Sequence, residues 1–160
     1  MGARKLLEAI YRIGGYQDIF IPEFTFGGKR IDALSINMRK KMVRGYEIKT
    51  SRADFMRDKK FQTYSNFCDL LYLVCPENLI RRDEIPDGIG LIYVIESEFY
   101  IWKYVKRAKR NRVDEKIFYR ILELEMPRLA FDSLCSKCIC EIIKRDFRIA
   151  HNFKKTGENL

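Results

Sequence analysis

The sequence predicts an α/β domain built on a mixed β-sheet that is flanked by helices. Helical and strand-like patterns alternate along the chain, which is typical of this class. One segment, residues 69–76, is continuously apolar, as expected for a strand that is buried on both faces. The chain has 160 residues, 47% of them hydrophobic, which is enough to form one domain with a substantial core.

An amphipathic helix is expected first, over residues 4–13. Leu6, Ile10 and Ile13 lie on one of its faces, and a pair of glycines ends it. Three adjacent strands then form the simplest arrangement, a meander. These strands are expected over residues 18–24, 30–36 and 42–50.

The second part of the chain continues the alternation. Ser51 and Asp54 resemble a capping box, which opens a helix expected over residues 52–67. Beyond residue 112 the pattern is helical, and Pro127 is expected to separate two helices. Further strands are expected over residues 69–76, 91–95 and 98–105. The predicted organisation is a single domain over 1–150, with a core over 18–103, a C-terminal helical extension over 112–150 and a flexible tail over 151–160.

The charge of the chain favours a polyanionic partner. The net charge is +9, and the basic residues gather in two blocks, around residues 39–44 and 103–112. Each phosphate contact releases condensed counterions, so such blocks suit nucleic acid, although a solvated basic surface is the alternative. Charge alone does not separate DNA from RNA or from anionic lipid. The residues predicted to contact nucleic acid are Arg39, Lys40, Lys41, Arg44, Ser51, Arg52, Lys106, Arg107, Lys109 and Arg110.

The cysteines and the apolar segments bear on the compartment. No apolar run approaches the roughly 20 residues that span a bilayer, so we expect a cytoplasmic protein with no membrane partner. Five cysteines, an odd number, argue against a disulfide framework, and Cys68 and Cys75 are expected in the core. The segment CSKCIC has a metal-ligand spacing between Cys135 and Cys138. Core packing is the favoured interpretation there, and a zinc or iron–sulfur site that includes Cys140 is the alternative.

The strand over residues 42–50 carries the candidate chemistry. Glu47 and Lys49 project from one face of this strand, and Ile48 points to the other. Asp32, on the preceding strand, can lie opposite Glu47 once the hairpin folds. Two close carboxylates repel each other unless a cation shares them, and Mg²⁺ prefers oxygen ligands. The predicted site therefore holds Mg²⁺ or Mn²⁺ on Asp32, Glu47 and the carbonyl of Ile48, with Lys49 assisting attack on a phosphate.

The expected helix over residues 52–67 adds two candidates. Met56, Lys60, Tyr64 and Phe67 fall on one stripe of it, so Lys60 is expected on a largely apolar face directed toward the sheet. An unpaired ammonium there is costly, and the site carboxylates or a bound phosphate are its candidate partners. The alternative is that Glu-Ile-Lys is an ordinary strand pair with a weak exposed salt bridge.

These residues resemble a known arrangement. Asp32, followed after a hairpin by EIKTSRADFMRDKKFQTYSNFCDLLYLVCP, is similar to the PD-(D/E)XK nuclease superfamily and, more narrowly, to the MmcB-like family of DNA-repair nucleases. The segment EFTFGGKRIDAL fits that family's approach to the first acidic residue, and the resemblance covers residues 18–94. It implies a restriction-endonuclease-like fold, with Asp32 and Glu47 as metal ligands and Lys49 as the catalytic lysine.

The resemblance implies further roles for four residues. Lys60 and Tyr64 match the helix whose side chains face the site or the DNA. Glu23 corresponds to an acidic residue beside the site, or alternatively to an exposed strand glutamate. Glu8 corresponds to a first-helix glutamate that lies near the metal in some members, although it falls opposite the apolar stripe of its helix.

The sequence therefore predicts a Mg²⁺-dependent DNA nuclease in repair, recombination or mobile-element biology. Superfamily members often pair to cut two strands, which leaves a homodimer open. The first alternative is a nucleic-acid-binding or adaptor module that keeps the fold but performs no chemistry. The second is a metal-binding redox or structural module that uses CSKCIC.

Overall fold

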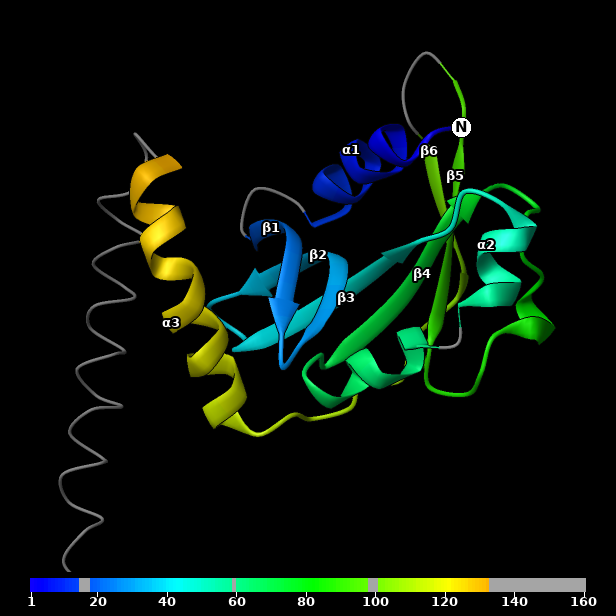
Figure 1. Ribbon diagram of the computed structural model, residues 1–160. Helices are drawn as coiled ribbons and strands as arrows, with labels where there is room; N and C mark the ends of the chain where they lie inside the picture. Colours follow the sequence, from blue (N-terminus) through cyan, green and yellow to red (C-terminus); the bar gives the residue numbers. More distant parts are fainter. Residues whose placement is uncertain (15–17, 59, 98–100, 133–160) are drawn as a thin grey trace, which may run out of the picture. The chain divides into compact units, whose positions relative to one another are not determined.

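The described chain confirms an α/β fold with a mixed sheet. A computed structural model describes residues 1–14, 18–58, 60–97 and 101–132. The sheet, shown in Figure 1, has six strands that follow one another in chain order from β1 to β6. The strands are β1 Asp18–Phe26, β2 Lys29–Asn37, β3 Met42–Ile48, β4 Leu70–Pro76, β5 Gly90–Ile95 and β6 Ile101–Lys106. The helices are α1 Ala3–Gly14, α2 Arg52–Arg57 and α3 Glu115–Asp132, with 3-10 segments η1 Lys60–Asn66 and η2 Arg82–Glu84.

The pairing of the strands confirms the predicted meander and extends it. β1, β2 and β3 are antiparallel neighbours, whereas β4 lies parallel to both β3 and β5. β6 returns antiparallel to β5. Parallel neighbours need a crossover connection, and α2 with η1 supplies the one between β3 and β4. This crossover lies directly after the candidate residues on β3.

α1 covers one face of the sheet. Leu6, Ala9 and Ile10 are fully buried, which confirms the predicted apolar face for two of its three members, while Ile13 is only partly buried. Their partners on the strands are Ala33, Tyr46, Ile48, Tyr72, Val74, Ile92 and Val94. Side chains alternate along a strand, so Glu47, between Tyr46 and Ile48, projects from the opposite face.

η1 packs on that opposite face, against β2, β3 and β4. Gly45 permits the close approach, because a Cβ at this position would lie 2.5 Å from the Sγ of Cys68 and 2.8 Å from Cδ1 of Ile31. Cys68 and Cys75 are both buried free thiols, which confirms the prediction that they pack in the core.

The single helix predicted over residues 52–67 is wrong. Ser51 does cap α2, since its Oγ accepts a hydrogen bond from the N–H of Asp54 at 3.2 Å. The helix nevertheless ends at Arg57, and Asp58 has an extended backbone with φ −90° and ψ 107°. Oδ1 of Asp58 accepts a hydrogen bond from the N–H of Lys60 at 2.8 Å, so a local side-chain contact replaces the helical turn.

The C-terminal region differs from its prediction at one described position. α3 continues to Asp132, so the expectation that Pro127 separates two helices is wrong. The φ of proline is compatible with a helix, and the helix loses only one backbone donor at this position. The chain divides into two compact units, Met1–Phe118 and Tyr119–Leu160, and the predicted domain boundaries stay a prediction. Cys135, Cys138 and Cys140 lie outside the described residues. None of the helices in the described residues has the length and apolar character needed to span a membrane.

Candidate active site

Glu47 and Lys49 form the centre of the candidate site at the end of β3. Both are buried, with exposed fractions of 6% and 2%. Lys49 follows the strand, and its N–H still donates to the carbonyl of Val74 at 2.9 Å, which continues the strand alternation. The two side chains therefore share a face, and Nζ of Lys49 donates to Oε1 of Glu47 at 3.0 Å.

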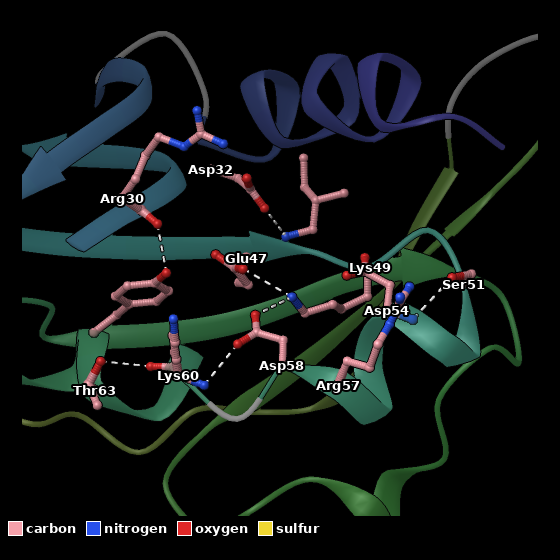
Figure 2. Close-up of polar contacts among 12 residues, drawn as sticks. Arg30, Asp32, Glu47, Lys49, Ser51, Asp54, Arg57, Asp58, Lys60 and Thr63 are labelled. Carbon is pink, nitrogen blue, oxygen red and sulfur yellow. Dashed lines mark hydrogen bonds and ion pairs between the residues drawn. The ribbon is translucent and has the colours of Figure 1, made fainter.

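Asp32 reaches the same place from β2. The antiparallel ladder pairs Ala33 with Tyr46, so one further step along the register sets Asp32 beside Glu47. The ladder ends there, and Oδ2 of Asp32 accepts a hydrogen bond from the N–H of Ile48 at 2.7 Å. The carboxylate thus replaces a backbone acceptor, and the structure brings Asp32, Glu47 and Lys49 together as the hairpin predicts (Figure 2).

Asp58 completes the cluster and was not predicted. Its Oδ2 lies 2.5 Å from Nζ of Lys49, and Figure 2 shows the ammonium held between Asp58 and Glu47. The contact arises because α2 ends early and the chain turns back toward the sheet. The sequence offers only a general tendency of Asp to bond its own backbone in a turn, which does not single out Asp58, since Asp54 lies within α2.

Burial and charge shift the carboxylates toward their neutral forms. Burial raises the pKa of Glu47 to about 7; the nearby charge of Asp32 acts in the same direction, and Lys49 opposes both. Burial also raises the pKa of Asp32, although the hydrogen bond from Ile48 and the charge of Lys49 act to lower it.

The Lys49–Asp58 pair is shifted toward its charged forms. Burial alone would lower the pKa of Lys49, but the hydrogen bond that its ammonium donates to Asp58 and the charge of Glu47 outweigh it, so the pKa is raised. For Asp58 burial acts to raise the pKa, and the contacts with Lys49 and the N–H of Lys60 outweigh it, so the pKa is lowered. Lys49 is therefore an ammonium near neutral pH.

One oxygen of the cluster has no donor. Among the described residues, Oε2 of Glu47 is buried without a hydrogen-bond partner. An unsatisfied buried acceptor is costly and is uncommon in folded proteins, so it calls for an explanation. A cation that binds this oxygen would satisfy it.

The donor set suits a hard cation. Within the described ranges, no group of three or more His, Cys, Asp or Glu side chains is arranged to hold a metal ion. Two carboxylates, from Asp32 and Glu47, and the carbonyl of Ile48 remain as oxygen donors. Mg²⁺ binds through one or two carboxylates and keeps several waters, so these residues fit it, whereas a structural zinc site needs four protein ligands.

Tyr64 and Lys60 lie beside the cluster in different ways. Tyr64 is buried, and its hydroxyl donates to the carbonyl of Arg30 at 2.6 Å, which ties η1 to the strand that carries Asp32. Burial raises its pKa to about 12, and the charges of Glu47 and Asp58 act in the same direction. The expectation that Lys60 is buried toward the sheet is wrong: it is exposed, because the 3-10 segment turns Phe61 and Tyr64 inward instead.

Glu23 and Glu8 are placed differently with respect to this cluster. Glu23 is exposed and has a left-handed backbone, with φ 51°, at the point of β1 that faces Asp32 in the register. Glu8 forms an ion pair with Arg4 at 3.4 Å and lines a separate pocket of about 820 Å³ with Tyr11 and Trp102. The structure does not place Glu8 with Asp32 and Glu47, because α1 packs on the other face of the sheet.

Comparison with known proteins identifies the family to which the chain belongs. A family model described as DNA repair protein MmcB-like matches residues 7–117, which include the whole candidate site. The chain belongs to the MmcB-like family.

A solved structure resembles this MmcB-like chain. It is the SPO1766 protein of unknown function from Silicibacter pomeroyi, with 22% sequence identity and a TM-score of 0.63. The similarity covers 80% of this chain and 88% of that one. At this identity the likeness shows the fold alone. The comparison with curated proteins gives no match.

Several cations of the MmcB-like chain that were predicted to contact nucleic acid have internal partners. Arg44 donates to Asp18 at 2.6 Å, and Arg52 forms two hydrogen bonds of 2.7 Å with Glu84. Lys106 donates to the carbonyl of Ile85 at 2.6 Å. Ser51, which was also predicted to contact nucleic acid, caps α2. Three further cations have partners: Lys41 and Arg110 form ion pairs with Glu115 and Asp69, and the guanidinium of Arg107 lies over the ring of Tyr104.

The remaining cations are exposed. Arg39, Lys40 and Lys109 keep exposed side chains, so they stay candidates for phosphate contacts. Arg30 is exposed too, and its charge acts to lower the pKa of Asp32, which places it at the border of the site. Arg30 was not predicted, because an isolated arginine before a buried strand residue carries no distinctive pattern.

Proposed function

We propose that this MmcB-like chain is a metal-dependent DNA nuclease that hydrolyses phosphodiester bonds at a PD-(D/E)XK-type site. The observation that carries the proposal is the cluster at the end of β3, where Asp32 and Glu47 lie beside the ammonium of Lys49. The buried and unpartnered Oε2 of Glu47 supports a role in binding a cation. The description of the family as DNA repair proteins supports DNA as the substrate.

Each residue of the cluster has its own role in the proposed hydrolysis. Asp32, Glu47 and the carbonyl of Ile48 would hold Mg²⁺ or Mn²⁺, which lowers the pKa of a coordinated water and neutralises charge on the phosphate. Lys49, as an ammonium, donates to the negative charge that develops at the scissile phosphate. Because its pKa is raised, Lys49 does not act as the proton acceptor near neutral pH, and an oxygen of the substrate phosphate takes this role.

The exposed cations near the cluster bind the DNA backbone. Arg30 and Lys60 border the site, and their contacts with phosphates make DNA binding weaker as the salt concentration rises. A homodimer and a cytoplasmic location stay predictions of the sequence.

Cleavage of labelled DNA by the wild type and by Glu47→Gln, with Mg²⁺ or Mn²⁺, tests the proposal. The wild type is expected to cut only with metal, and the variant to lose at least about 100-fold in rate, because the isosteric amide is a poor ligand for a hard cation. Glu77→Gln, a change of an exposed glutamate just after β4, is the matched control and keeps the wild-type rate.

The same experiment separates the nuclease from an inactive DNA-binding module on the same fold. Single-stranded, duplex, branched and damaged substrates are all assayed. If the wild type binds these DNAs but cuts none of them with either metal, the nuclease proposal fails and the binding module takes its place.

A further inference from the structure

The chain breaks between α2 and η1 at Asp58, next to Lys49. The N–H of Asp58 donates to the carbonyl of Asp54 at 3.1 Å, and its Oδ1 accepts from the N–H of Lys60 at 2.8 Å. These two contacts hold the backbone and one carboxylate oxygen. The second oxygen, Oδ2, is thereby directed at Lys49 (Figure 2).

Lys49 approaches from the sheet and is fixed at both ends. Its backbone N–H is bound to the carbonyl of Val74, and its Nζ lies 2.5 Å from Asp58 and 3.0 Å from Glu47. Lysine has a flexible four-carbon stem, so an ammonium with a single carboxylate partner can move between the two oxygens of that partner. A second carboxylate on the far side removes this freedom.

We propose that Asp58 is a positioning residue, which holds the Lys49 ammonium at Oε1 of Glu47 and so keeps Oε2 open for a cation. Without Asp58, the remaining carboxylate partner of Lys49 is Glu47, and the ammonium can move to cover both oxygens. Oε2, which has no hydrogen-bond partner within the described part of the chain, would then be occupied by Lys49. The catalytic consequence rests on the proposed nuclease function, whereas the position of Lys49 does not.

Asp58→Asn is the test variant, because it keeps the size of the side chain and one oxygen for the N–H of Lys60 but removes the charge that faces Lys49. Thr63→Ala is the matched control, since it removes a hydrogen bond of 2.7 Å to the carbonyl of Lys60 in the same segment without touching Lys49. Circular dichroism and thermal unfolding check that both variants fold.

The first measurement is the side-chain ammonium signal of Lys49 in ¹⁵N-resolved NMR spectra of the full chain, without metal or DNA. The signal is assigned by its loss in Lys49→Arg. A slowly exchanging signal is expected in the wild type and in Thr63→Ala, and its loss is expected in Asp58→Asn. A signal that is absent from the wild type, or that survives in Asp58→Asn, overturns the proposal.

The second measurement is the affinity for Mn²⁺ by titration calorimetry. Asp58→Asn is expected to bind Mn²⁺ about 10-fold more weakly, in the range found for residues that orient metal ligands, and Asp58→Glu to regain part of the loss. Equal affinities in the wild type and Asp58→Asn, or no binding to the wild type, overturn the claim that Asp58 keeps Oε2 open.

Cleavage assays then separate this proposal from the proposed function. If Asp58 acts only through Lys49, Asp58→Asn is expected to lower kcat about 10-fold with KM for DNA unchanged. A raised KM with an unchanged kcat contradicts the positioning role. If the wild type cuts no DNA, the nuclease proposal fails, and the ammonium signal and the Mn²⁺ affinity still decide the role of Asp58.

Discussion

Two largely buried charged clusters share the strands β2 and β3 and differ in how their oxygens are satisfied. The Asp18 cluster comprises Asp18, Ser35, Asn37 and Arg44, and the Glu47 cluster comprises Asp32, Glu47, Lys49 and Asp58. Asp18 accepts hydrogen bonds from Ser35 at 3.2 Å, Asn37 at 2.7 Å and Arg44 at 2.6 Å. Glu47 accepts one from Lys49, and its Oε2 accepts none from the residues that the structure describes. The two clusters therefore differ less in burial than in the supply of hydrogen-bond donors, and the Glu47 cluster is the one that lacks them.

The two clusters also differ in formal charge. The Asp18 cluster holds one carboxylate and one guanidinium, so its formal charge is zero. The Glu47 cluster holds three carboxylates and one ammonium, which is a formal charge of −2 when all are ionised. A buried excess of negative charge is costly unless protons or a cation compensate it, and the raised pKa of Glu47 expresses that cost. The Glu47 cluster is thus the one that favours an added cation.

Removing a charge from the Asp18 cluster should have the largest effect on stability. In Asp18→Asn the guanidinium of Arg44, which is 24% exposed, loses its anionic partner. We expect a loss of about 3 kcal/mol in the free energy of unfolding, measured by urea denaturation, while cleavage by the folded protein stays at the wild-type rate. The control is Asp83→Asn. Both side chains of the Asp83–Arg81 ion pair are 73% exposed, so this change should alter the free energy of unfolding little. A loss of cleavage in folded Asp18→Asn would break the distinction between the clusters.

The distinction also marks where sequence patterns stop being informative. Strand alternation alone places Glu47 and Lys49 on one face, and the hairpin register alone brings in Asp32, so this part of the site follows from local periodicity. Arg44 shows the opposite case. Its partner Asp18 lies 26 residues earlier in the chain, and no local pattern distinguishes this arginine from one that binds phosphate.

Asp58 and Lys60 show a second limit. A helical period of 3.6 residues was extended through a position where a side chain competes with the backbone, and Lys60, just after the break, was then assigned to the wrong face, whereas Tyr64 and Phe67 are buried as predicted. The break also depends on the sheet, since Lys49 supplies the charge that holds Asp58 in place. Such a contact between a crossover segment and a strand is set by tertiary packing, which helix periodicity does not contain.

In the Glu47 cluster, removing a carboxylate charge should raise the free energy of unfolding instead of lowering it. The pKa of Glu47 is about 7 in the folded chain and about 4.5 without its surroundings, so the folded state holds this proton more tightly. As the pH rises from about 4.5 to 7, the unfolded state loses the proton first, and the wild type becomes less stable relative to Glu47→Gln. We expect Glu47→Gln to equal the wild type in stability at pH 4 and to exceed it by about 3 kcal/mol at pH 8, measured by denaturation of the metal-free protein. A variant that is less stable than the wild type at pH 8 would contradict this assignment.

The smallest effect is expected at the border of the Glu47 cluster, where Arg30 is exposed. Arg30→Ala leaves the carbonyl that binds Tyr64 in place, so the change removes a charge and little structure. If this arginine contacts one phosphate, DNA binding weakens only a few-fold, and the slope of log K against log salt becomes shallower by about 0.9. Lys5→Ala is the matched control, because Lys5 pairs with Glu96 and lies on α1, which packs against the sheet face opposite Glu47. Fluorescence anisotropy over a range of salt concentrations measures both slopes. Equal changes in the two variants would mean that DNA senses only the net charge of the chain, and that the face of the sheet that carries Glu47 is not where it binds.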